Sequence, residues 1–415
     1  MYNISLLEKV IFEQQTTFNT KNAGTLRDIN FQKYLKTRQI TVIMGARRSG
    51  KSTLLRQFSA HFDSFYYINF DDERLINFTV KDFDTLLTAF RKRFQAATLF
   101  MDEVQHVPMW ERFVRRIFDE DFKIFVTGSN AGLLSSEYAT HLTGRYFPIN
   151  LYPFSFKEYL RFHRVAYERP DSRTRAAVLT RFDEYLADGS FPEFVVTRDR
   201  DILQRIYEDI LHRDLLTRFK IRDAKAFREL TQYLFSNLTS AVSYNALCNT
   251  LGFKNASSVR NYISYLEEAW LMFALYKYDW SLKKRFVSDK KIYVIDNGLR
   301  NAVAFSFSPD QGKLLENIVF LELKRRGHKV YFYKGKRECD FLIYDRGRIS
   351  AAFQVAATLT PANERREREG LIEALTMAKL GEGTLLTLDH EESTVQEGGH
   401  TIVVRPVWKW LLGLE

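Results

Sequence analysis

Cysteine and long apolar runs are the two features that this sequence has least of. Its two cysteines, Cys248 and Cys339, lie far apart among 415 residues, so we expect neither a disulfide framework nor a zinc cluster. No segment approaches the roughly 18 consecutive apolar residues of a membrane-spanning helix, so no membrane partner is expected. Helices are expected over residues 4–15, with Leu6, Leu7, Val10 and Ile11 on a common face, and over residues 26–36. The first fifteen residues also carry Glu8 and Glu13 in an amphipathic pattern that is not typical of a signal peptide. These absences favour a cytoplasmic location.

Length and charge set the next limits. A chain of 415 residues with 45% hydrophobic residues is too long for one compact core, so two or three globular domains are expected. The formal net charge of +10 is compatible with an anionic partner such as nucleic acid. Many basic proteins have no such partner, so the charge by itself indicates little.

A phosphate-binding pattern follows the first apolar strand. Residues 40–44 are apolar and partly β-branched, and good helix formers follow Lys51, with G-x-x-x-x-G-K-[ST] between the two. Glycines let backbone N–H groups face a phosphate at the start of a helix. Lys51 is expected to reach the β- and γ-phosphates of ATP, and the Ser52 hydroxyl to hold Mg²⁺. The predicted nucleotide-binding residues are Gly45, Ala46, Arg47, Arg48, Ser49, Gly50, Lys51, Ser52 and Thr53.

A second strand of the same kind ends in two acids. Residues 98–101 are mostly apolar and run directly into Asp102 and Glu103, about 50 residues after the phosphate loop, which is the Walker B arrangement. We expect Asp102 to lie near the Mg²⁺ ion held by Ser52. Glu103 is expected to polarise the attacking water.

A third strand ends in a polar turn. Residues 123–126 are expected to form the strand, and residues 127–130 read Thr-Gly-Ser-Asn. Either Ser129 or Asn130 could contact the γ-phosphate or orient the water, and we favour Asn130 because its amide both donates and accepts hydrogen bonds. The alternative is an ordinary Gly-Ser-Asn turn.

Five segments resemble a prokaryotic family of AAA-type ATPases. They are residues 45–53, FMDEVQHVPMWERFVRR (100–116), VTGSNAGLLS (126–135), LTGRYFPINLYPFSFKEYL (142–160) and DGSFPEFV (188–195). The likeness runs essentially end to end, and in that family an ATPase domain is joined to a C-terminal nuclease-like domain of unknown function. It implies that Asn130 senses the γ-phosphate and that Arg145 reaches the γ-phosphate of a neighbouring subunit. A salt-bridged surface residue is the alternative for Arg145.

The region after the ATPase core is expected to be a helical lid. Residues 157–225 have helical periodicity with a break at 189–192. Within it, Arg213 and Asp214 are expected to form a buried ion pair between helices. Contact of Arg213 with nucleotide is the alternative.

Residues 226–300 are predicted to form a winged helix. Ser243 is expected to cap a short helix over 244–251, which ends at a glycine, and Asn255 or Ser257 is expected to cap a longer helix that runs to about residue 271. This is the helix-turn-helix order, and two strands follow. Cations that could neutralise DNA phosphates are Lys254, Arg260 and, in the expected wing, Lys283, Lys284 and Arg285. Winged helices also serve as protein-interaction modules, so both kinds of partner stay open.

The last region, 301–415, resembles the restriction-endonuclease-like core. Glu316 on a helix and Asp340 on a strand stand where such enzymes place metal ligands. The third position reads Gln354-Val355-Ala356, so an amide replaces a carboxylate and Ala356 replaces the lysine that supports the attacking water. An amide offers a hard cation only a neutral, weaker oxygen. We therefore expect a nuclease-like fold without nuclease activity.

Together these patterns predict an α/β protein with a P-loop (AAA-type) parallel sheet, a helical lid, a winged helix and an α/β restriction-endonuclease-like domain. The expected domain boundaries are 1–156, 157–225, 226–300 and 301–415. The predicted function is Mg²⁺-dependent ATP hydrolysis coupled to conformational change, with DNA as a candidate partner. Homo-oligomers are expected, and AAA-type rings suggest a hexamer by analogy alone. The alternatives are an ATP-regulated DNA-binding switch, an ATP-dependent nuclease and a nucleotide-controlled assembly factor.

Overall fold

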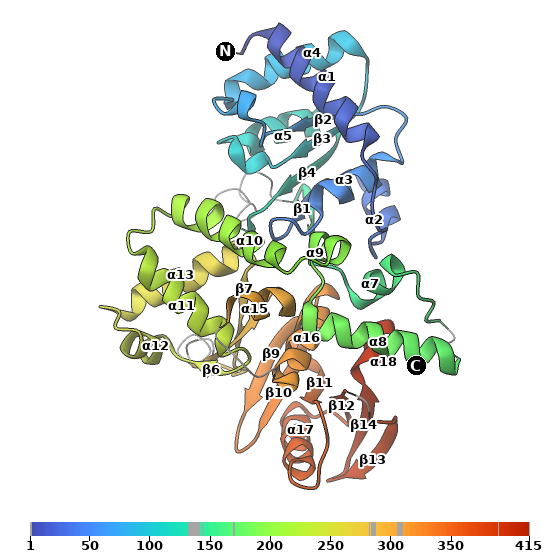
Figure 1. The fold of residues 1–415 in the computed structure, drawn as a ribbon, viewed down its shortest axis with the longest axis vertical. Helices are drawn as coiled ribbons and strands as arrows, with labels where there is room; N and C mark the ends of the chain where they lie inside the picture. The colour runs from blue at the N-terminus through green and yellow to red at the C-terminus, as the bar shows by residue number, and fades with distance from the viewer. Residues whose placement is uncertain are drawn as a thin grey trace. The chain divides into compact units, whose positions relative to one another are not determined.

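The structure is a computed structural model that describes residues 2–131, 142, 144–168, 171–281, 283, 288–304, 310–388 and 390–414. The chain divides into two compact units, residues 1–152 with 268–270, and residues 153–267 with 271–415 (Figure 1). The predicted separations at 225 and 300 fall inside the second unit and stay predictions. Lys284 and Arg285 of the expected wing lie outside the described residues, as do residues 132–135 of the third segment that resembles AAA-type ATPases.

A parallel sheet forms the centre of the first unit. In the described part of that unit it has five strands in the order β2-β3-β4-β1-β5, and every neighbouring pair is parallel. The strands are β1 (Ile40–Met44), β2 (Tyr66–Asn69), β3 (Thr98–Asp102), β4 (Lys123–Gly128) and β5 (Tyr146–Asn150). Strands β1 and β3 are buried along their whole length, as expected for parallel strands covered on both faces. The carboxyl ends of β1, β3 and β4 meet at one edge of this sheet.

Helices cover both faces of this sheet. They are α1 (Ile4–Thr20), α2 (Phe31–Lys36), α3 (Lys51–Ser59), α4 (Phe83–Arg93) and α5 (Trp110–Asp119), with short helical turns at Glu73–Leu75, Val80–Asp82 and Val104–His106. On one face α1 and α3 pack against the sheet through Phe18, Phe58 and Phe125. On the other face α4 stacks Phe90 on Tyr66 of β2, with ring centroids 4.6 Å apart. Figure 1 shows α3 and α5 on opposite sides of the strands.

The amino-terminal helices differ from the sequence prediction. Helix α1 runs to Thr20 rather than ending near residue 15, because Phe18 is buried and stacks on Tyr67 with ring centroids 3.9 Å apart. Leu6, expected on its buried face, is 37% exposed. Helix α2 begins at Phe31 rather than Leu26, since the Asn30 side chain accepts a hydrogen bond from the backbone of the first turn.

The second unit begins with helices. They are α7 (Phe156–Phe162), α8 (Ser172–Asp188), α9 (Pro192–Thr197), α10 (Asp201–Asp209), a π-helical continuation (Ile210–Thr217), α11 (Ala224–Ser236), α12 (Tyr244–Thr250), α13 (Ala256–Glu268) and α15 (Asn297–Val303). The predicted break at 189–192 separates α8 from α9. Arg213 is exposed, so the expectation of a buried ion pair with Asp214 is wrong; Arg213 lies on the outer side of the π-helical turn.

Three short strands accompany helices α11 to α13. They are β6 (Ala241–Val242), β7 (Met272–Tyr276) and β8 (Lys290–Val294), hydrogen-bonded in the antiparallel order β6-β8-β7. The Ser243 hydroxyl caps α12 as predicted, by accepting a hydrogen bond from Ala246 N–H at 3.1 Å. Of the two predicted caps for α13, Asn255 is the one that accepts a hydrogen bond, from Ser258 N–H at 2.8 Å.

A mixed sheet forms the carboxyl-terminal part of the second unit. Its order among the described residues is β13-β14-β12-β11-β10-β9. The elements are α16 (Gln311–Arg325), β9 (Lys329–Lys334), β10 (Glu338–Asp345), β11 (Arg348–Ala356), α17 (Glu364–Ala378), β12 (Glu382–Thr387), β13 (Ser393–Glu397), β14 (His400–Pro406) and α18 (Val407–Leu412). Helix α17 packs on strands β10 to β12, while α16 contacts β11 and α18. Within the described ranges, none of the chain's helices has both the length and the apolar character needed to cross a membrane.

A buried carboxylate joins two distant segments of the second unit. Asp296 caps α15 by accepting from Leu299 N–H at 2.9 Å, and it also accepts from Ser190 N–H at 2.6 Å. Burial raises the pKa of Asp296 to about 6. The close approach requires glycine, since a Cβ at Gly298 would lie 1.9 Å from the Asp188 carbonyl oxygen. The segment 188–195, one of the five that resemble AAA-type ATPases, thus packs closely against the start of α15.

Candidate functional site

The phosphate loop connects β1 to α3 and depends on residues with unusual backbone conformations. Gly50 at the start of α3 has φ 98°, and Arg48 adopts the left-handed region at φ 63°. Gly45 lies so close to the neighbouring backbone that a Cβ there would be 2.2 Å from the Leu151 carbonyl oxygen. Glycine at these positions lets the chain turn tightly while its backbone amides remain in the loop.

The Lys51 ammonium lies inside this loop. Its side chain is 3% exposed and its Nζ donates to the carbonyl oxygens of Gly45 and Ala46, each at 3.2 Å. The same Nζ is 3.5 Å from Oε1 of Glu103. The structure thus brings together the lysine and the second acid that the sequence placed about 50 residues apart.

Asp102 is held by three hydroxyl groups. Ser52 and Thr127 both hydrogen-bond to its carboxylate, and the Tyr67 hydroxyl donates to Oδ2 at 3.2 Å. Burial raises the pKa of Asp102, and the neighbouring charge of Glu103 adds to the effect. The predicted pairing of Ser52 with Asp102 is therefore present as a direct contact.

Glu103 occupies a strained and well-supported position. Its backbone is left-handed at φ 52°, and its N–H donates to the Thr127 hydroxyl at 3.0 Å. Gln105 Nε2 donates to the Glu103 carboxylate at 2.5 Å and to the Ser129 hydroxyl at 3.2 Å. Burial by itself would raise the pKa of Glu103, but the positive charge of Lys51, the hydrogen bond from Gln105 and the charge of Arg47 together outweigh it, so the pKa lies below its ordinary value.

The remaining predicted residues are distributed around this centre. Arg47 contributes positive charge that lowers the pKa of Glu103. Thr53 points toward Arg56, whose Nη2 donates to its hydroxyl at 3.1 Å. Asn130 is buried just beyond the carboxyl end of β4, two residues from the last strand residue. Its role as a sensor stays a prediction.

Arg145 lies at the opposite edge of the sheet. Its carbonyl oxygen accepts a hydrogen bond from Ile40 N–H at the start of β1, whereas the phosphate loop follows the end of β1. The Arg145 guanidinium is 3.9 Å from the Asp119 carboxylate. It therefore does not belong to the site of its own chain, and action on a neighbouring copy stays a prediction.

Sequence reasoning missed Arg27, which supports the loop from outside the motif. Its guanidinium is buried and donates to the carbonyl oxygens of Ser49 at 2.9 Å and Tyr152 at 2.6 Å. Gln57 on α3 holds the adjoining backbone by donating to the carbonyl oxygens of Ala23 and Thr25, each at 2.8 Å.

Thr127, Tyr67 and Gln105 were missed as well, and the position of one of them offers a signal. Thr127 is the last polar side chain of β4 before the glycine, and Tyr67 lies on the strand next to β3. Polar groups at the carboxyl ends of neighbouring parallel strands converge on one edge of a sheet, so Thr127 could have been proposed from the strand order. Tyr67 is the second residue of β2 and reaches Asp102 through the length of its side chain.

The acids predicted in the last region also come together, but around a partner that was not predicted. Glu316 on α16 and Asp340 on β10 both contact the Lys291 ammonium of β8. Gln354 lies beside Asp340 with its amide engaged by the protein, and Ala356 ends β11.

Comparisons with known proteins identify the relatives of the chain. Residues 37–160 match the family described as AAA domain, and residues 179–310 match a domain of unknown function. An uncharacterized protein of Methanocaldococcus jannaschii is 36% identical over 428 residues, covering 98% of this chain and 96% of that protein. An uncharacterized protein of Haemophilus influenzae is 33% identical over 323 residues, covering 73% of this chain and 79% of that protein.

Similarity to solved structures is much weaker. The Orc1 protein of Aeropyrum pernix in complex with DNA aligns with 11% identity and a TM-score of 0.32, covering 69% of this chain and 94% of that one. A likeness this distant transfers no activity. The sequence relatives are decisive: the chain belongs to the same family as the two uncharacterized proteins, and its residues 37–160 form an AAA domain.

Proposed function

We propose that this protein is a Mg²⁺-dependent ATPase of the AAA type. The single observation that carries the proposal is the buried cluster at the carboxyl edge of the parallel sheet. There the Ser52 hydroxyl hydrogen-bonds to Asp102, and Lys51 Nζ lies 3.5 Å from the Glu103 carboxylate. A lysine and a hydroxyl at the start of α3 and two acids at the end of β3 have no evident structural reason to converge in a P-loop domain unless they serve a triphosphate and its metal.

The residues present fit Mg-ATP. A hydroxyl and a carboxylate are the hard oxygen donors that Mg²⁺ prefers, and Ser52 and Asp102 would hold it. The Ser49 hydroxyl in the same loop is fully buried and has no hydrogen-bond partner among the described residues. A buried hydroxyl without a partner is costly unless a ligand satisfies it. Bound Mg²⁺ would neutralise charge on the phosphates during transfer to water.

The chain's own groups suit the roles of base and positioning residues. Glu103 is ionised at neutral pH because Lys51 lowers its pKa, so it can accept a proton from water. Gln105 and the Thr127 hydroxyl fix the Glu103 side chain and backbone respectively. Lys51 would neutralise phosphate charge, and Arg27 keeps the loop carbonyl of Ser49 in place.

The test separates binding from hydrolysis. Glu103→Gln keeps the shape of the side chain but removes the base, so ATP turnover should fall by about 100-fold or more while ATP affinity, measured by calorimetry, is retained. Lys51→Met should lose ATP binding as well. Glu120→Gln, at the exposed end of α5, is the matched control and should behave as wild type. Unchanged turnover in Glu103→Gln would refute the proposal.

We propose further that Arg145 completes the site of a neighbouring copy. Its position at the amino edge of the sheet rules out its own loop, and it is only partly exposed, beside Asp119. A guanidinium delivered across a subunit boundary would stabilise charge on the γ-phosphate. This requires a homo-oligomer, and a ring would satisfy it for every copy.

Contact with DNA through α13 is a second candidate, favoured by the arrangement of charge on this helix. Lys254 and Arg260 are exposed at and near its start, and Glu267 is turned inward, accepting a hydrogen bond from Ala274 N–H at 2.8 Å. With β6, β7 and β8 the segment has the element order of a winged helix. The double variant Lys254→Ala/Arg260→Ala should weaken DNA binding and reduce its salt dependence, whereas Lys379→Ala should not. Equal affinity and salt slope would exclude this surface.

A further inference from the structure

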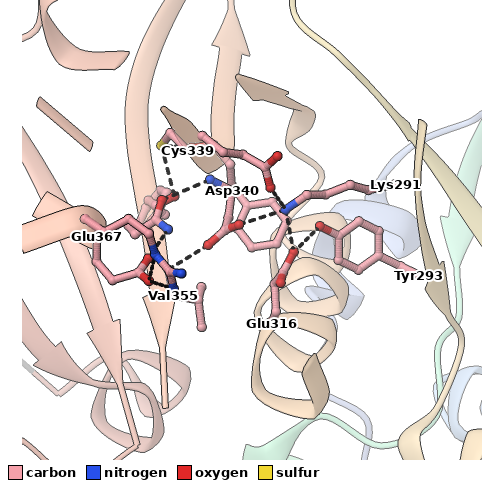
Figure 2. Close-up of polar contacts among 12 residues, drawn as sticks. Lys291, Tyr293, Glu316, Cys339, Asp340, Val355 and Glu367 are labelled. Carbon is pink, nitrogen blue, oxygen red and sulfur yellow. Dashed lines mark hydrogen bonds and ion pairs between the residues drawn. The ribbon is translucent and has the colours of Figure 1, made fainter. Parts of the chain in front are cut away.

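A buried lysine lies at the centre of three carboxylates in the second unit. Lys291 projects from β8, its side chain is 4% exposed, and its Nζ is 3.1 Å from Glu316, 2.7 Å from Glu338 and 2.8 Å from Asp340. Figure 2 shows its side chain reaching toward Asp340 and Glu316. The acids come from α16 and from alternate positions of β10, so three separate elements supply one charge cluster.

The other contacts of the acids hold each of them in place. The Tyr293 hydroxyl donates to Glu316 at 2.7 Å, and Val355 N–H donates to Asp340 Oδ2 at 3.0 Å (Figure 2). Gln354 is used within the protein, accepting from Asp340 N–H at 3.2 Å and donating to Glu367 at 2.7 Å. At the position where a nuclease of this kind would have a metal-binding carboxylate, the Gln354 amide instead connects Asp340 to Glu367.

The charges of the cluster do not balance with one cation. Burial alone would lower the pKa of Lys291, but the carboxylates Asp340, Glu316 and Glu338 raise it well above its ordinary value, so the ammonium is charged. Burial and the negative charge of Asp340 raise the pKa of Glu316 to about 7. Even with Glu316 only partly ionised near neutral pH, the single ammonium faces the carboxylates of Glu338 and Asp340 as well, so the acids around it carry more negative charge than one cation neutralises.

We propose that the Lys291 ammonium stands in the position of a divalent cation, so that this site needs and binds no metal in the wild-type protein. Removing the ammonium would leave Glu316, Glu338 and Asp340 facing one point, beside a cavity of about 440 Å³. As arranged around Lys291, the described acids are not placed to hold a metal ion directly. A smaller ion would draw their oxygens inward from ammonium distances to about 2.2 Å.

The presence of a lysine ammonium instead of a metal ion also explains why β8 is fixed to the carboxyl-terminal sheet. Near one end of β8, Lys291 binds acids of α16 and β10. At the other end, the Asn317 side chain accepts from Val294 N–H at 3.0 Å and donates to its carbonyl oxygen at 3.1 Å. Because the cation is part of β8, the connection of this strand to α16 and β10 is permanent, whereas a connection made by an exchangeable metal ion would depend on the metal concentration.

The test compares Mn²⁺ binding by wild type, three variants of the cluster and one control variant in the absence of nucleotide. Wild type, Lys291→Met, Asp340→Asn and the double variant Lys291→Met/Asp340→Asn are titrated with Mn²⁺, and free ion is followed by electron paramagnetic resonance. Binding that disappears with Asp340→Asn belongs to this cluster, which separates it from the nucleotide site. Lys334→Met, an exposed lysine of β9, is the matched control.

We expect Lys291→Met to bind one Mn²⁺ that wild type, Lys334→Met and the double variant do not bind. Its unfolding midpoint should rise by about 4 °C in about 1 mM Mn²⁺, with no rise in wild type. Asp340-dependent Mn²⁺ binding by wild type, or Asp340-dependent cleavage of DNA in Mn²⁺, would overturn the proposal. So would a folded Lys291→Met that gains no Mn²⁺. If Lys291→Met fails to fold, Lys291→Gln takes its place under the same criteria, and the wild-type comparison with Asp340→Asn decides independently.

Discussion

Thr127 gives the sharpest test of the site, because one hydroxyl serves both acids. It donates to Asp102 and accepts from Glu103 N–H at 3.0 Å. Thr127→Val preserves the shape of the side chain and removes both hydrogen bonds. A hydrogen bond to a buried charged group contributes about 1.5 to 3 kcal/mol, and a buried N–H left without a partner costs about 1 to 3 kcal/mol. The free energy of unfolding of the first unit should therefore fall by about 3 kcal/mol.

Thr127→Val should also lower the rate of ATP hydrolysis. Glu103 is left-handed at φ 52°, and its backbone loses the acceptor that holds it there. A displacement of about 1 Å at a reacting group can lower a rate by about 100-fold, and we expect ATP turnover in Thr127→Val to fall by about that factor.

Two assays report these effects separately. Hydrogen exchange at the amides of β3 and β4 measures the loss of stability, and steady-state ATP hydrolysis measures turnover. Thr127→Ser keeps the hydroxyl and is the control; it should retain most of both quantities. Wild-type protection and turnover in Thr127→Val would refute the reasoning, and so would equal losses in Thr127→Ser and Thr127→Val, because the hydroxyl would then not be the group that matters.

Three further predictions concern other parts of the chain. Gly298→Ala places a methyl group against the Asp188 carbonyl oxygen and should destabilise the second unit by about 3 kcal/mol in urea unfolding. Because burial raises the pKa of Asp296 to about 6, its protonation favours the folded state; relative to Asp296→Asn, wild type should gain roughly 2 kcal/mol as pH falls from 7 to 4, and lose it as pH rises through 6. Arg145→Ala should lack ATP turnover, and mixing it with Lys51→Met should restore part of that turnover if the arginine acts between copies.

Each of these has a clear contrary result. Gly312→Ala, whose Cβ would meet Asp310 Oδ1 at 3.4 Å, is the control for Gly298→Ala, and equal stability of the two variants would contradict the packing argument. A constant difference between wild type and Asp296→Asn across pH 4 to 7 would mean that this carboxyl does not titrate there. Arg145→Ala with full turnover, or no recovery on mixing, would remove the arginine from the mechanism.

The residues of the candidate site that belong to contiguous motifs could be predicted from the sequence, and those that act through long-range contacts could not. Lys51 and Ser52 follow from a contiguous pattern, and Asp102 from an apolar strand that ends in acids, because both signals lie within a few residues. Thr127 and Arg27 act through groups that lie at least 20 residues away; Arg27 lies outside every motif, and the pattern at 127–130 drew attention to Ser129 and Asn130 rather than to Thr127. Their roles depend on which strands and loops are neighbours, which periodicity alone does not reveal.

The carboxyl-terminal cluster shows the same division. Glu316 and Asp340 were singled out from their order along the chain, and the structure brings them together. Lys291 was not predicted, because it precedes Glu316 by 25 residues and belongs to a strand that was assigned to the winged-helix region 226–300. The two amino-terminal helices were misplaced for a related reason: Phe18 and Asn30 set their ends through particular contacts rather than through helix propensity.

The anchoring of residues 21–30 has a mechanical consequence. This arm joins α1 to the phosphate loop through Arg27, which donates to the carbonyl oxygen of Ser49 within the loop and to that of Tyr152 just after β5, and through Gln57, which holds the arm's backbone. A displacement of α1 would therefore reach the backbone of the loop through hydrogen bonds that lie outside the motif itself. Under the proposed function, a protein bound to α1 or fused to it would change the affinity of the loop for nucleotide without contacting the site.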